Sequence, residues 1–599
     1  MHKSLMFLFA SALSAVSAHT ASGSDFKDWA QTPPLGWNSW DSFGTTINEA
    51  QAKEQADAMA QYLKPYGWEY FTVDIQWYEP NARGHDYKAG APLEMDAYSR
   101  LIPATSKFPS AAEGHGFKPL ADYVHSKGLK FGIHLMRGIA KQAVKENTPI
   151  WGTSAHAADV ANIQSTCQWN PDMYGVDMGK EGAQTYYDSL FQMYADWGVD
   201  LVKVDDIARP YDEVQKAEIE AIRKAIDKTG RPIVLSLSPG DTPIEKGSHV
   251  MTQANMWRIS DDFWDRWPPL YGMFERLNKW TQYRTAGTWP DADMLPFGKV
   301  EFGRPTNFTK DEQLTCMSLW CIARSPLILG ADMTQMDTFT LDLLTNPEVL
   351  EVNQHSDNNR QLSNADNLIV WVADVPGSKD KYVGLFNAQD NSDPFDLTSP
   401  DFQAVLTHEA PGSQVININL SIDGAKTLVL AVDEGGDGSG YDHAAWIEPK
   451  LIGPGKTFQL SNLPWALATS GWGVPQKDKT IDGKPLQLNG REVKGIGTHA
   501  KSVIEFDLPE GYNTFTAKGV VTDGSVQPGR LTFMVLIDPE KVTLPDKANV
   551  AVSFEDLGIT GKASVRDLWA RKDLGTFESS FGQELPLHGA GLYRISPEE

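Results

Sequence analysis

The chain of 599 residues carries a formal net charge of −25, and its pI is near 4.9. That length is too great for one hydrophobic core, so we expect several domains, one of which can be a large barrel. The strong negative charge argues against nucleic acid or an anionic membrane as a partner and favours an uncharged substrate.

The first 18 residues have the pattern of a secretory signal peptide. Lys3 precedes the apolar run 5–10, and small residues follow as far as Ala18. We expect cleavage near Ala18 and a mature protein that is secreted or periplasmic. No later apolar run reaches the roughly 18 residues that a membrane-spanning helix needs.

Between residues 28 and 355, segments of strand character alternate with segments of helical character. The first strand is expected at Gly36. The other seven strands are expected over 70–76, 131–134, 200–206, 233–238, 256–262, 291–295 and 326–332. Helices are expected at 48–63, 120–126, 182–197, 212–228, 270–281, 309–323 and 341–352. Eight strands with interleaved helices predict a (β/α)8 TIM barrel. An open doubly wound sheet is the alternative, but no glycine-rich dinucleotide turn follows an early strand.

Three cysteines are an odd number and too few for a disulfide framework. Cys316 and Cys321 fall in the expected helix 309–323, where a free cysteine serves as a small apolar side chain. We therefore expect stability to come from packed cores, and we do not expect Cys167 or this pair to form a metal site.

Several expected barrel strands place polar side chains on one face near their C-terminal ends. Lys203 and Asp205 share such a face, because side chains alternate along a strand with a period of two. An isolated pair of this kind is typical of a surface salt bridge, but a repeated pattern is typical of the active-site end of a TIM barrel. The polar side chains are those of Asp74, His134, Lys203, Asp205, Ser238, Arg258, Asp262, Asp291 and Asp293.

Asp205 and Asp262 end the fourth and sixth expected strands. Two carboxylates across a barrel mouth suit glycoside hydrolysis, in which one attacks the anomeric carbon and the other protonates the leaving oxygen. Lys203 would keep Asp205 ionised. A hard metal cation held by Asp205, Asp206 and Asp262 is the alternative.

Beyond residue 360, short alternating segments replace the helices. They predict a small antiparallel β-sandwich over 360–433. The glycine-rich run 434–440 begins an expected linker that covers 434–457. A second β-rich module is expected over 458–599.

Four motifs follow one another in the order of a known enzyme family. They are Pro34–Trp40, Lys203 with Asp205, Arg258 with Asp262, and Trp289–Leu295. In these motifs the chain resembles glycoside hydrolase family 27, the α-galactosidase family, over about residues 28–435. The resemblance implies a retaining double displacement with Asp205 as nucleophile and Asp262 as acid/base, their carboxyl groups about 5–5.5 Å apart. It implies no metal or cofactor, and the sugar contacts that it implies are Trp40, Asp74, Lys203 and Arg258.

The C-terminal module carries motifs of its own at 468–473, 495–500 and Phe506–Pro509. In these it resembles the NPCBM type of carbohydrate-binding domain, which implies that it binds sugar. A purely structural β-sandwich is the alternative.

Three positions depart from the family pattern. In the family, two adjacent aspartates bind the O4 and O6 hydroxyls of the sugar, and the corresponding residues here are Asp74 and Ile75. Strand parity would turn Ile75 outward, so one hydroxyl loses its expected acceptor. Ser238, followed by Pro239 and Gly240, replaces an acidic and aromatic loop. His134–Arg137 replaces a tyrosine–acid run. Ser238, His134 and Arg137 are therefore candidate substrate contacts, although His134 also fits a structural histidine.

Losing hydrogen-bonding groups in a sugar pocket can retarget an enzyme by several powers of ten. The leading hypothesis is an exo-acting enzyme that releases terminal α-galactosyl residues from an oligosaccharide or polysaccharide. An α-glucan-active enzyme of the isomaltodextranase kind is one alternative, and a catalytically inactive carbohydrate-binding protein is another. The oligomeric state is not predicted.

Overall fold

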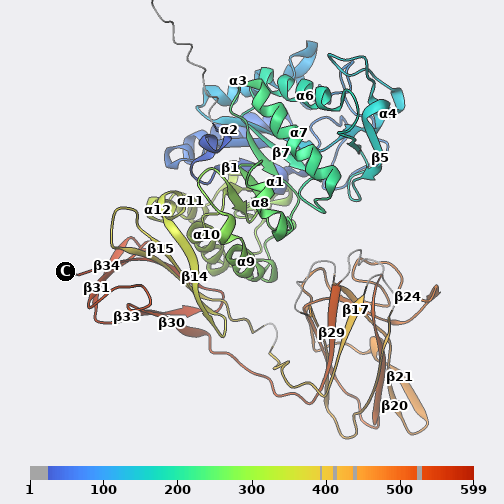
Figure 1. Cartoon of the computed structure of the whole chain (residues 1–599). Helices are drawn as coiled ribbons and strands as arrows, with labels where there is room; N and C mark the ends of the chain where they lie inside the picture. The colour runs from blue at the N-terminus through green and yellow to red at the C-terminus, as the bar shows by residue number, and fades with distance from the viewer. Residues whose placement is uncertain (1–24, 392–393, 409–413, 436–441, 523–528, 599) are drawn as a thin grey trace, which may run out of the picture. The chain divides into compact units, whose positions relative to one another are not determined.

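Figure 1 shows the computed structural model of the chain, which describes residues 25–391, 394–408, 414–435, 442–522 and 529–598. The predicted signal peptide, residues 1–18, lies outside these ranges. The chain divides into two compact units. The first consists of residues up to 262 with segments 279–305 and 324–345, and the second consists of segments 263–278 and 306–323 with the residues from 346 onward.

Eight parallel strands form the sheet of the first unit, in the order β10-β9-β8-β7-β3-β2-β1-β13. A parallel bridge between Leu295 and Leu329 joins the segment after β10 to β13. The predicted (β/α)8 barrel is thus confirmed, with each strand near its predicted position. The strands are β1 Leu35–Asn38, β2 Tyr70–Val73, β3 Lys130–Met136, β7 Leu201–Asp205, β8 Val234–Leu237, β9 Met256–Arg258, β10 Trp289–Asp291 and β13 Leu327–Leu329.

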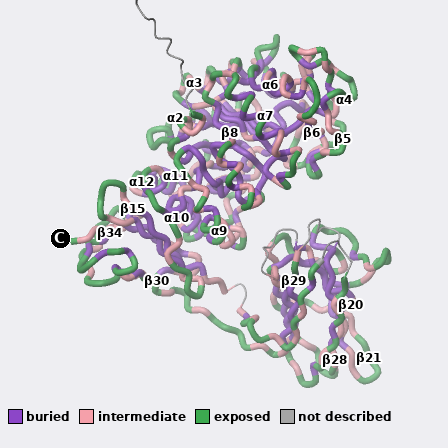
Figure 2. Tube along the Cα trace, viewed as in Figure 1, coloured by how far each residue is buried: buried purple, intermediate pink, exposed green. Residues whose placement is uncertain are grey.

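The barrel strands are short and almost wholly buried. Every residue of β1, β2 and β8 is buried, as expected for parallel strands that are covered on both faces. Figure 2 shows buried residues running along the strands, whereas exposed residues gather in the loops.

Helices follow the strands in the predicted alternation. In the first unit they are α1 Trp40–Phe43, α2 Glu49–Tyr62, α3 Lys118–Ser126, α4 Lys141–Glu146, α5 Ala157–Val160, α6 Ala183–Trp197, α7 Glu213–Thr229, α8 Gly247–Val250 and α11 Thr338–Leu344. Helices α9 Trp267–Trp280, α10 Lys310–Ala323 and α12 Pro347–His355 fall almost wholly in the second unit. No helix within the described ranges is long and apolar enough to span a bilayer.

Local chemistry explains where these helices begin and end. Asn48 and Gln51 form the expected capping box at the start of α2. The single helix predicted over 341–352 is wrong, because α11 ends at Leu344 and α12 begins at Pro347. Proline disfavours helical geometry in the residue before it, and Asn346 instead caps α12 by accepting from Glu348 N at 3.0 Å.

The long connection between β3 and β7 contains a small antiparallel sheet. Its strands are β4 Ile139–Ala140, β5 Ala161–Thr166 and β6 Met173–Val176, in the order β4-β6-β5. A second short pair, β11 Lys299–Val300 and β12 Arg304–Pro305, follows β10.

The β-sandwich of the second unit combines strands from two distant parts of the chain. β16 pairs with β34 although about 200 residues separate them in sequence. Val383, Leu385, Val550, Phe581 and Ile595 share one buried cluster. The six-stranded sheet contains β14 Asp357–Ala365, β15 Leu368–Asp374, β16 Lys381–Asn387, β34 Ala590–Pro597, β31 Ala563–Asp567 and β32 Lys572–Phe577, and a further pair contains β30 Lys547–Ser553 and β33 Ser580–Pro586.

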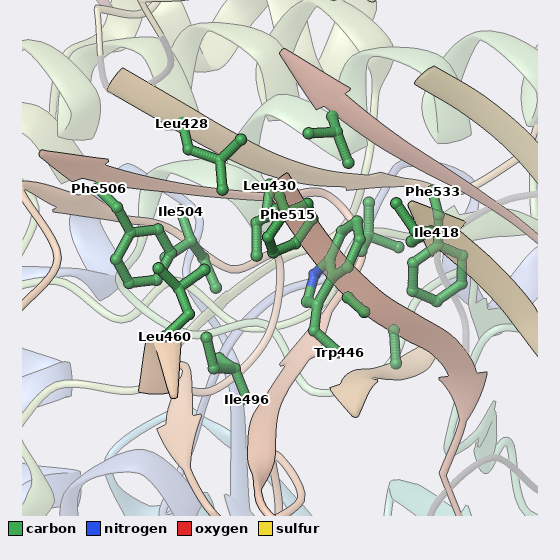
Figure 3. Packing of buried hydrophobic residues seen from close by; sticks show 14 of the residues in the cluster. Ile418, Leu428, Leu430, Trp446, Leu460, Ile496, Ile504, Phe506, Phe515 and Phe533 are labelled. Atoms are coloured by element: carbon green, nitrogen blue, oxygen red, sulfur yellow. The ribbon is translucent and has the colours of Figure 1, made fainter. Parts of the chain in front are cut away.

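A second β-module is formed by the part of the sequence between β16 and β30. Its main sheets run β17-β29-β19-β27-β22 and β18-β28-β20-β26-β23. Trp446 lies in its core with Phe533, at a ring distance of 5.1 Å (Figure 3). The strands are β17 Phe402–His408, β18 Ile416–Ser421, β19 Thr427–Asp433, β20 His443–Gly453, β21 Lys456–Gln459, β22 Leu467–Ala468, β23 Gln476–Lys477, β24 Gln487–Leu488, β25 Arg491–Glu492, β26 Gly495–His499, β27 Ser502–Asp507, β28 Thr514–Val521 and β29 Gly529–Ile537.

The predicted order of a sandwich at 360–433, a linker at 434–457 and a module at 458–599 is therefore wrong. The second module is inserted into the first sandwich, and residues 443–453 of the predicted linker form β20. Residues 436–441 of that linker lie outside the described residues. Alternation predicts that a segment is a strand, but it carries no information about which distant strand it pairs with.

The predicted burial of Cys316 and Cys321 in a helix is confirmed. Cys316 and Cys321 are fully buried in α10, and Cys167 is also buried; all three are free thiols.

Candidate active site

Asp205 ends β7 with its carboxylate firmly held. His134 Nε2 lies 3.1 Å from Asp205 Oδ2, and Asp206 N donates to Asp205 Oδ1 at 2.9 Å. Burial alone would raise the pKa of this carboxyl, but the His134 contact, the nearby Lys203 charge and the backbone donor outweigh it and lower the pKa to about 2. Asp205 is thus an ionised carboxylate at neutral pH, as a nucleophile requires.

Lys203 reaches across the barrel to Asp74 at the end of β2. Its Nζ lies 3.0 Å from Asp74 Oδ2, which also accepts from Asn38 Nδ2 at 2.6 Å. Burial opposes the charge of Lys203, but Asp74 and Asp205 raise its pKa. Burial likewise opposes the charge of Asp74, yet Lys203 and further donors lower its pKa. Both groups therefore remain charged.

Asp262 lies in a loop, because β9 ends four residues earlier at Arg258. The prediction that it ends the sixth strand is therefore wrong, and alternation along β9 does not set its direction. Its side chain is 59% exposed, and Arg258 Nη2 lies 3.3 Å from Asp262 Oδ1. The Asp262 carboxyl is therefore open to solvent and held on one side by the buried Arg258.

Arg258 connects the two predicted catalytic carboxylates electrostatically. Burial lowers the pKa of this guanidinium, but the charges of Asp293, Asp262, Asp291 and Asp205 together raise it. Its Nη1 lies 2.8 Å from Asp293 Oδ1. Asp205 and Asp262 thus both act on one buried arginine.

Two buried acids beside this group, Asp293 and Asp41, have raised pKa values. Burial raises the pKa of Asp293 to about 7, with Arg258 opposing and Asp262 adding to the shift. Burial and the nearby Asp293 also raise the pKa of Asp41, in α1, well above its usual range. Asp293 was on the predicted polar face, whereas Asp41 follows the Pro34–Trp40 motif and carried no sign of burial.

Arg137 supports the loop after Asp205. Its Nη2 lies 3.0 Å from Asp206 Oδ2, its Nη1 lies 3.0 Å from Glu218 Oε1, and its Nε donates to Asp206 O at 2.5 Å. The side chain is only 4% exposed. The structure thus places Arg137 under the site, with its donors occupied, and not among open sugar contacts as the sequence suggested.

The other predicted contacts lie at the ends of β2 and β8 and in α1. Ser238 is buried, and its backbone links β8 to the loop after β7 by accepting from Ile207 N at 3.0 Å. β2 ends at Val73, so strand parity does not set the direction of Ile75, which is buried at 2% exposure. Trp40 is half-buried at the start of α1.

Tyr87 is a functional candidate that sequence reasoning missed. Burial raises the pKa of its phenol, and the next causes are the negative charges of Asp205, Asp74 and Asp262. Its ring lies 6.3 Å from that of Trp40, with the two planes nearly parallel. Tyr87 lies in the long connection between β2 and α3.

A small cavity of about 30 Å³ lies inside the barrel beneath the site. It can hold a water molecule but no sugar ring. Its lining contains four charged side chains, so a water there would have polar partners. It is lined by Asn38, Thr72, Leu201, Lys203, Ser236, Met256, Arg258, Asp291, Asp293, Met294 and Ile328.

The alternative of a metal held by Asp205, Asp206 and Asp262 finds no matching arrangement. Asp205 is turned to His134, Asp206 to Arg137 and Asp262 to Arg258. Within the described ranges, no group of three or more His, Cys, Asp or Glu side chains is arranged to hold a metal ion.

Three known domain families match parts of the chain. Residues 171–355 match the family described as alpha galactosidase A, and residues 525–595 match the alpha galactosidase C-terminal β-sandwich domain. Residues 403–452 and 456–552 match the NPCBM/NEW2 domain, as expected for a module inserted into that sandwich.

Curated relatives and solved structures point to one enzyme class. Alpha-galactosidase 2 of Arabidopsis thaliana is 31% identical over 329 residues, which cover 54% of this chain and 67% of that protein. Alpha-galactosidase A of Cellvibrio japonicus is 32% identical over 349 residues, which cover 56% and 70%. The crystal structure of a GH27 β-L-arabinopyranosidase from Geobacillus stearothermophilus is 38% identical with a TM-score of 0.68, and the match covers 96% of this chain and 98% of that one.

Proposed function

Because the chain belongs to glycoside hydrolase family 27 and is a glycosidase, we propose that it is a retaining exo-acting enzyme for terminal sugars of galacto configuration. We further propose that it prefers β-L-arabinopyranosides to α-D-galactosides. A β-L-arabinopyranosyl ring has the configuration of an α-D-galactosyl ring but carries hydrogen in place of the C6 hydroxymethyl group.

The reaction follows from the two carboxyl groups. Asp205 attacks the anomeric carbon and displaces the aglycone, while Asp262 protonates the leaving oxygen. A covalent glycosyl-enzyme results. Asp262 then removes a proton from water, which attacks the same carbon and frees Asp205, so the sugar keeps its anomeric configuration.

Ile75 is the observation that carries the sugar preference. It stands where α-galactosidases of the family have a second aspartate, and it is a buried side chain that cannot accept a hydrogen bond. Asp74 remains as the acceptor for the O4 hydroxyl, but the O6 hydroxyl of galactose would be left without its acceptor. A buried hydroxyl without a partner weakens binding, whereas arabinopyranose has no such group. The match with the Geobacillus arabinopyranosidase supports the same substrate.

α-Galactoside hydrolysis is the second candidate, because the curated relatives named above are α-galactosidases. The two candidates differ only at C6. The site geometry around Asp205 and Asp262 serves both equally.

Initial rates on p-nitrophenyl β-L-arabinopyranoside and p-nitrophenyl α-D-galactoside test this choice. We expect kcat/KM to favour the arabinoside at least about tenfold, and we expect Ile75→Asp to move the ratio toward the galactoside by a similar factor. Ile75→Leu is the matched control and should leave the ratio unchanged. Equal or faster turnover of the galactoside by the wild-type protein would overturn the preference.

Two further substrates test the remaining alternatives. Turnover of an aryl α-glucoside or of dextran would favour an α-glucan-active enzyme. Turnover of none of the four substrates would favour a carbohydrate-binding protein without catalysis.

A further inference from the structure

Five aromatic side chains form a continuous arc within the first unit. Ring centroids lie 5.3 Å apart for Phe302 and His85, 4.9 Å for His85 and Trp40, 6.3 Å for Trp40 and Tyr87, and 5.5 Å for Tyr87 and Trp169. We call these five residues the aromatic arc. They come from α1, from the connection after β2, from the connection after β3 and from the loop after β11.

The centre of the arc adjoins the polar end of the barrel. Trp40 N donates to Asn38 Oδ1 at 2.9 Å, and Asn38 Nδ2 donates to Asp74 Oδ2 at 2.6 Å. The negative charges of Asp205, Asp74 and Asp262 also raise the pKa of the Tyr87 phenol. The two ends of the arc reach solvent, because Trp169 is 38% exposed and Phe302 is 57% exposed. The arc therefore extends from the polar end of the barrel to the surface of the first unit.

Local contacts hold the arc in place. His85 Nε2 lies 3.4 Å from Trp40 O, and Asn170 N, next to Trp169, donates to Cys167 Sγ at 3.3 Å. Phe302 has a φ of 61°, which costs a bulky residue free energy and is concentrated at functional sites. An exposed aromatic ring held in such a conformation is better explained by a ligand than by packing.

We propose that the aromatic arc is the aglycone subsite and binds the neutral sugar ring next to the scissile bond by stacking. This deepens, and rests on, the proposed glycosidase reaction. The C–H face of a sugar ring packs against aromatic faces, and large aromatic side chains supply such contact area with little loss of side-chain entropy. Asp205 is ionised beside the arc, so an aglycone with a carboxylate, such as a uronic acid, is disfavoured.

The test compares two substrates that share one glycosyl group and differ in the aglycone. Methyl β-L-arabinopyranoside offers only a methyl group, whereas a β-L-arabinopyranosyl disaccharide offers a neutral sugar ring. We expect Trp169→Ala and Phe302→Ala each to lower kcat/KM for the disaccharide roughly fivefold while changing it less than twofold for the methyl glycoside. The conservative variants Trp169→Phe and Phe302→Tyr should restore most of the loss.

Trp151→Ala is the matched control. Trp151 is 51% exposed in the same unit, but its ring contacts Tyr98 and Arg100 and not the arc. It should leave both substrates unaffected.

Each remaining outcome decides the proposal. A parallel loss on both substrates, or no loss on either, would overturn the aglycone subsite. If the wild-type enzyme cleaves galactosides instead, methyl α-galactoside and melibiose form the equivalent pair, so the arabinoside preference fails while the arc is still tested. If it cleaves neither pair, the proposed function fails and the arc proposal fails with it.

Discussion

At the scale of single residues, the charge state of Asp205 depends on a histidine from the neighbouring strand. β3 and β7 are paired in register with His134 opposite Lys203, which sets the His134 ring beside the Asp205 carboxylate. Of all the groups that lower the pKa of Asp205 against the effect of burial, His134 is the strongest. The other reading of His134, as a sugar contact, leaves this contact with Asp205 unexplained.

Replacing His134 should therefore move the acid limb of the activity profile. With His134→Ala the pKa of Asp205 rises from about 2, so the carboxylate is protonated at higher pH and kcat/KM falls earlier on acidification. We expect the limb to move up by about one pH unit. The measurement is kcat/KM against pH on an aryl glycoside.

His125→Ala is the control for this prediction. His125 forms the same kind of pair with Asp200, at 2.7 Å, immediately before the start of β7. It should not move the acid limb. An unchanged limb in His134→Ala would show that the histidine does not set the charge of Asp205.

The sequence located side chains well on strands and poorly in loops. Lys203, Asp205 and Arg258 lie on β7 and β9, where alternation along buried strands placed them, and their roles stay predictions. Tyr87 lies in a loop, whose path depends on tertiary contacts. Arg137 was assigned to the sugar because its partners could not be seen: Asp206 and Glu218 are 69 and 81 residues away in sequence.

At the scale of elements, α7 supports the loop that follows Asp205. Asp212 caps this helix, accepting from Val214 N and Gln215 N, and Gln215 completes the capping box. Glu218, in the second turn of α7, binds Arg137, which in turn binds Asp206 next to Asp205. The start of α7 therefore matters for the fold and for the site.

Removing the cap should destabilise the protein measurably. We expect Asp212→Ala to lower the free energy of unfolding by about 1 kcal/mol, because two backbone donors lose their acceptor, and Asp212→Asn to recover most of this loss. The measurement is the urea midpoint of the transition that abolishes activity.

Lys224→Ala serves as the comparison, since Lys224 is exposed on the same helix. Its midpoint should match that of the wild-type protein. A midpoint for Asp212→Ala as high as that of Lys224→Ala would mean that the cap contributes nothing.

Element prediction worked through hydrophobic period, and it failed at boundaries. Eight barrel strands and the start of the helix at Asn48 are local features, so the sequence contains them. The strand expected over 256–262 ends at Arg258, which leaves Asp262 in a loop. The single helix expected over 341–352 is divided into α11 and α12 before Pro347.

At the scale of the whole molecule, the second β-module is inserted into the first β-sandwich. The chain leaves and re-enters the first sandwich at neighbouring points, because Phe395 bridges Lys541 and Val542 N donates to Pro394 O at 2.7 Å. An inserted module whose ends lie side by side can be removed without stretching the host. Pairing between strands some 200 residues apart is invisible in a single sequence, which is why the domain order was predicted wrongly.

Two deletions with opposite outcomes test this architecture. Removing residues 395–541 and joining Pro394 to Val542 through a short Gly/Ser linker keeps β14–β16 and β30–β34 with their common core. We expect a soluble monodisperse protein whose kcat/KM on aryl glycosides stays within about threefold of the wild-type value, because each retained core side chain keeps its burial.

Ending the chain at residue 433 instead removes β34, the partner of β16, and exposes Val383 and Leu385. That protein should aggregate, since a long apolar sheet edge is an aggregation site. Size-exclusion chromatography and thermal unfolding distinguish the two, and a folded truncation beside an aggregated internal deletion would contradict the insertion.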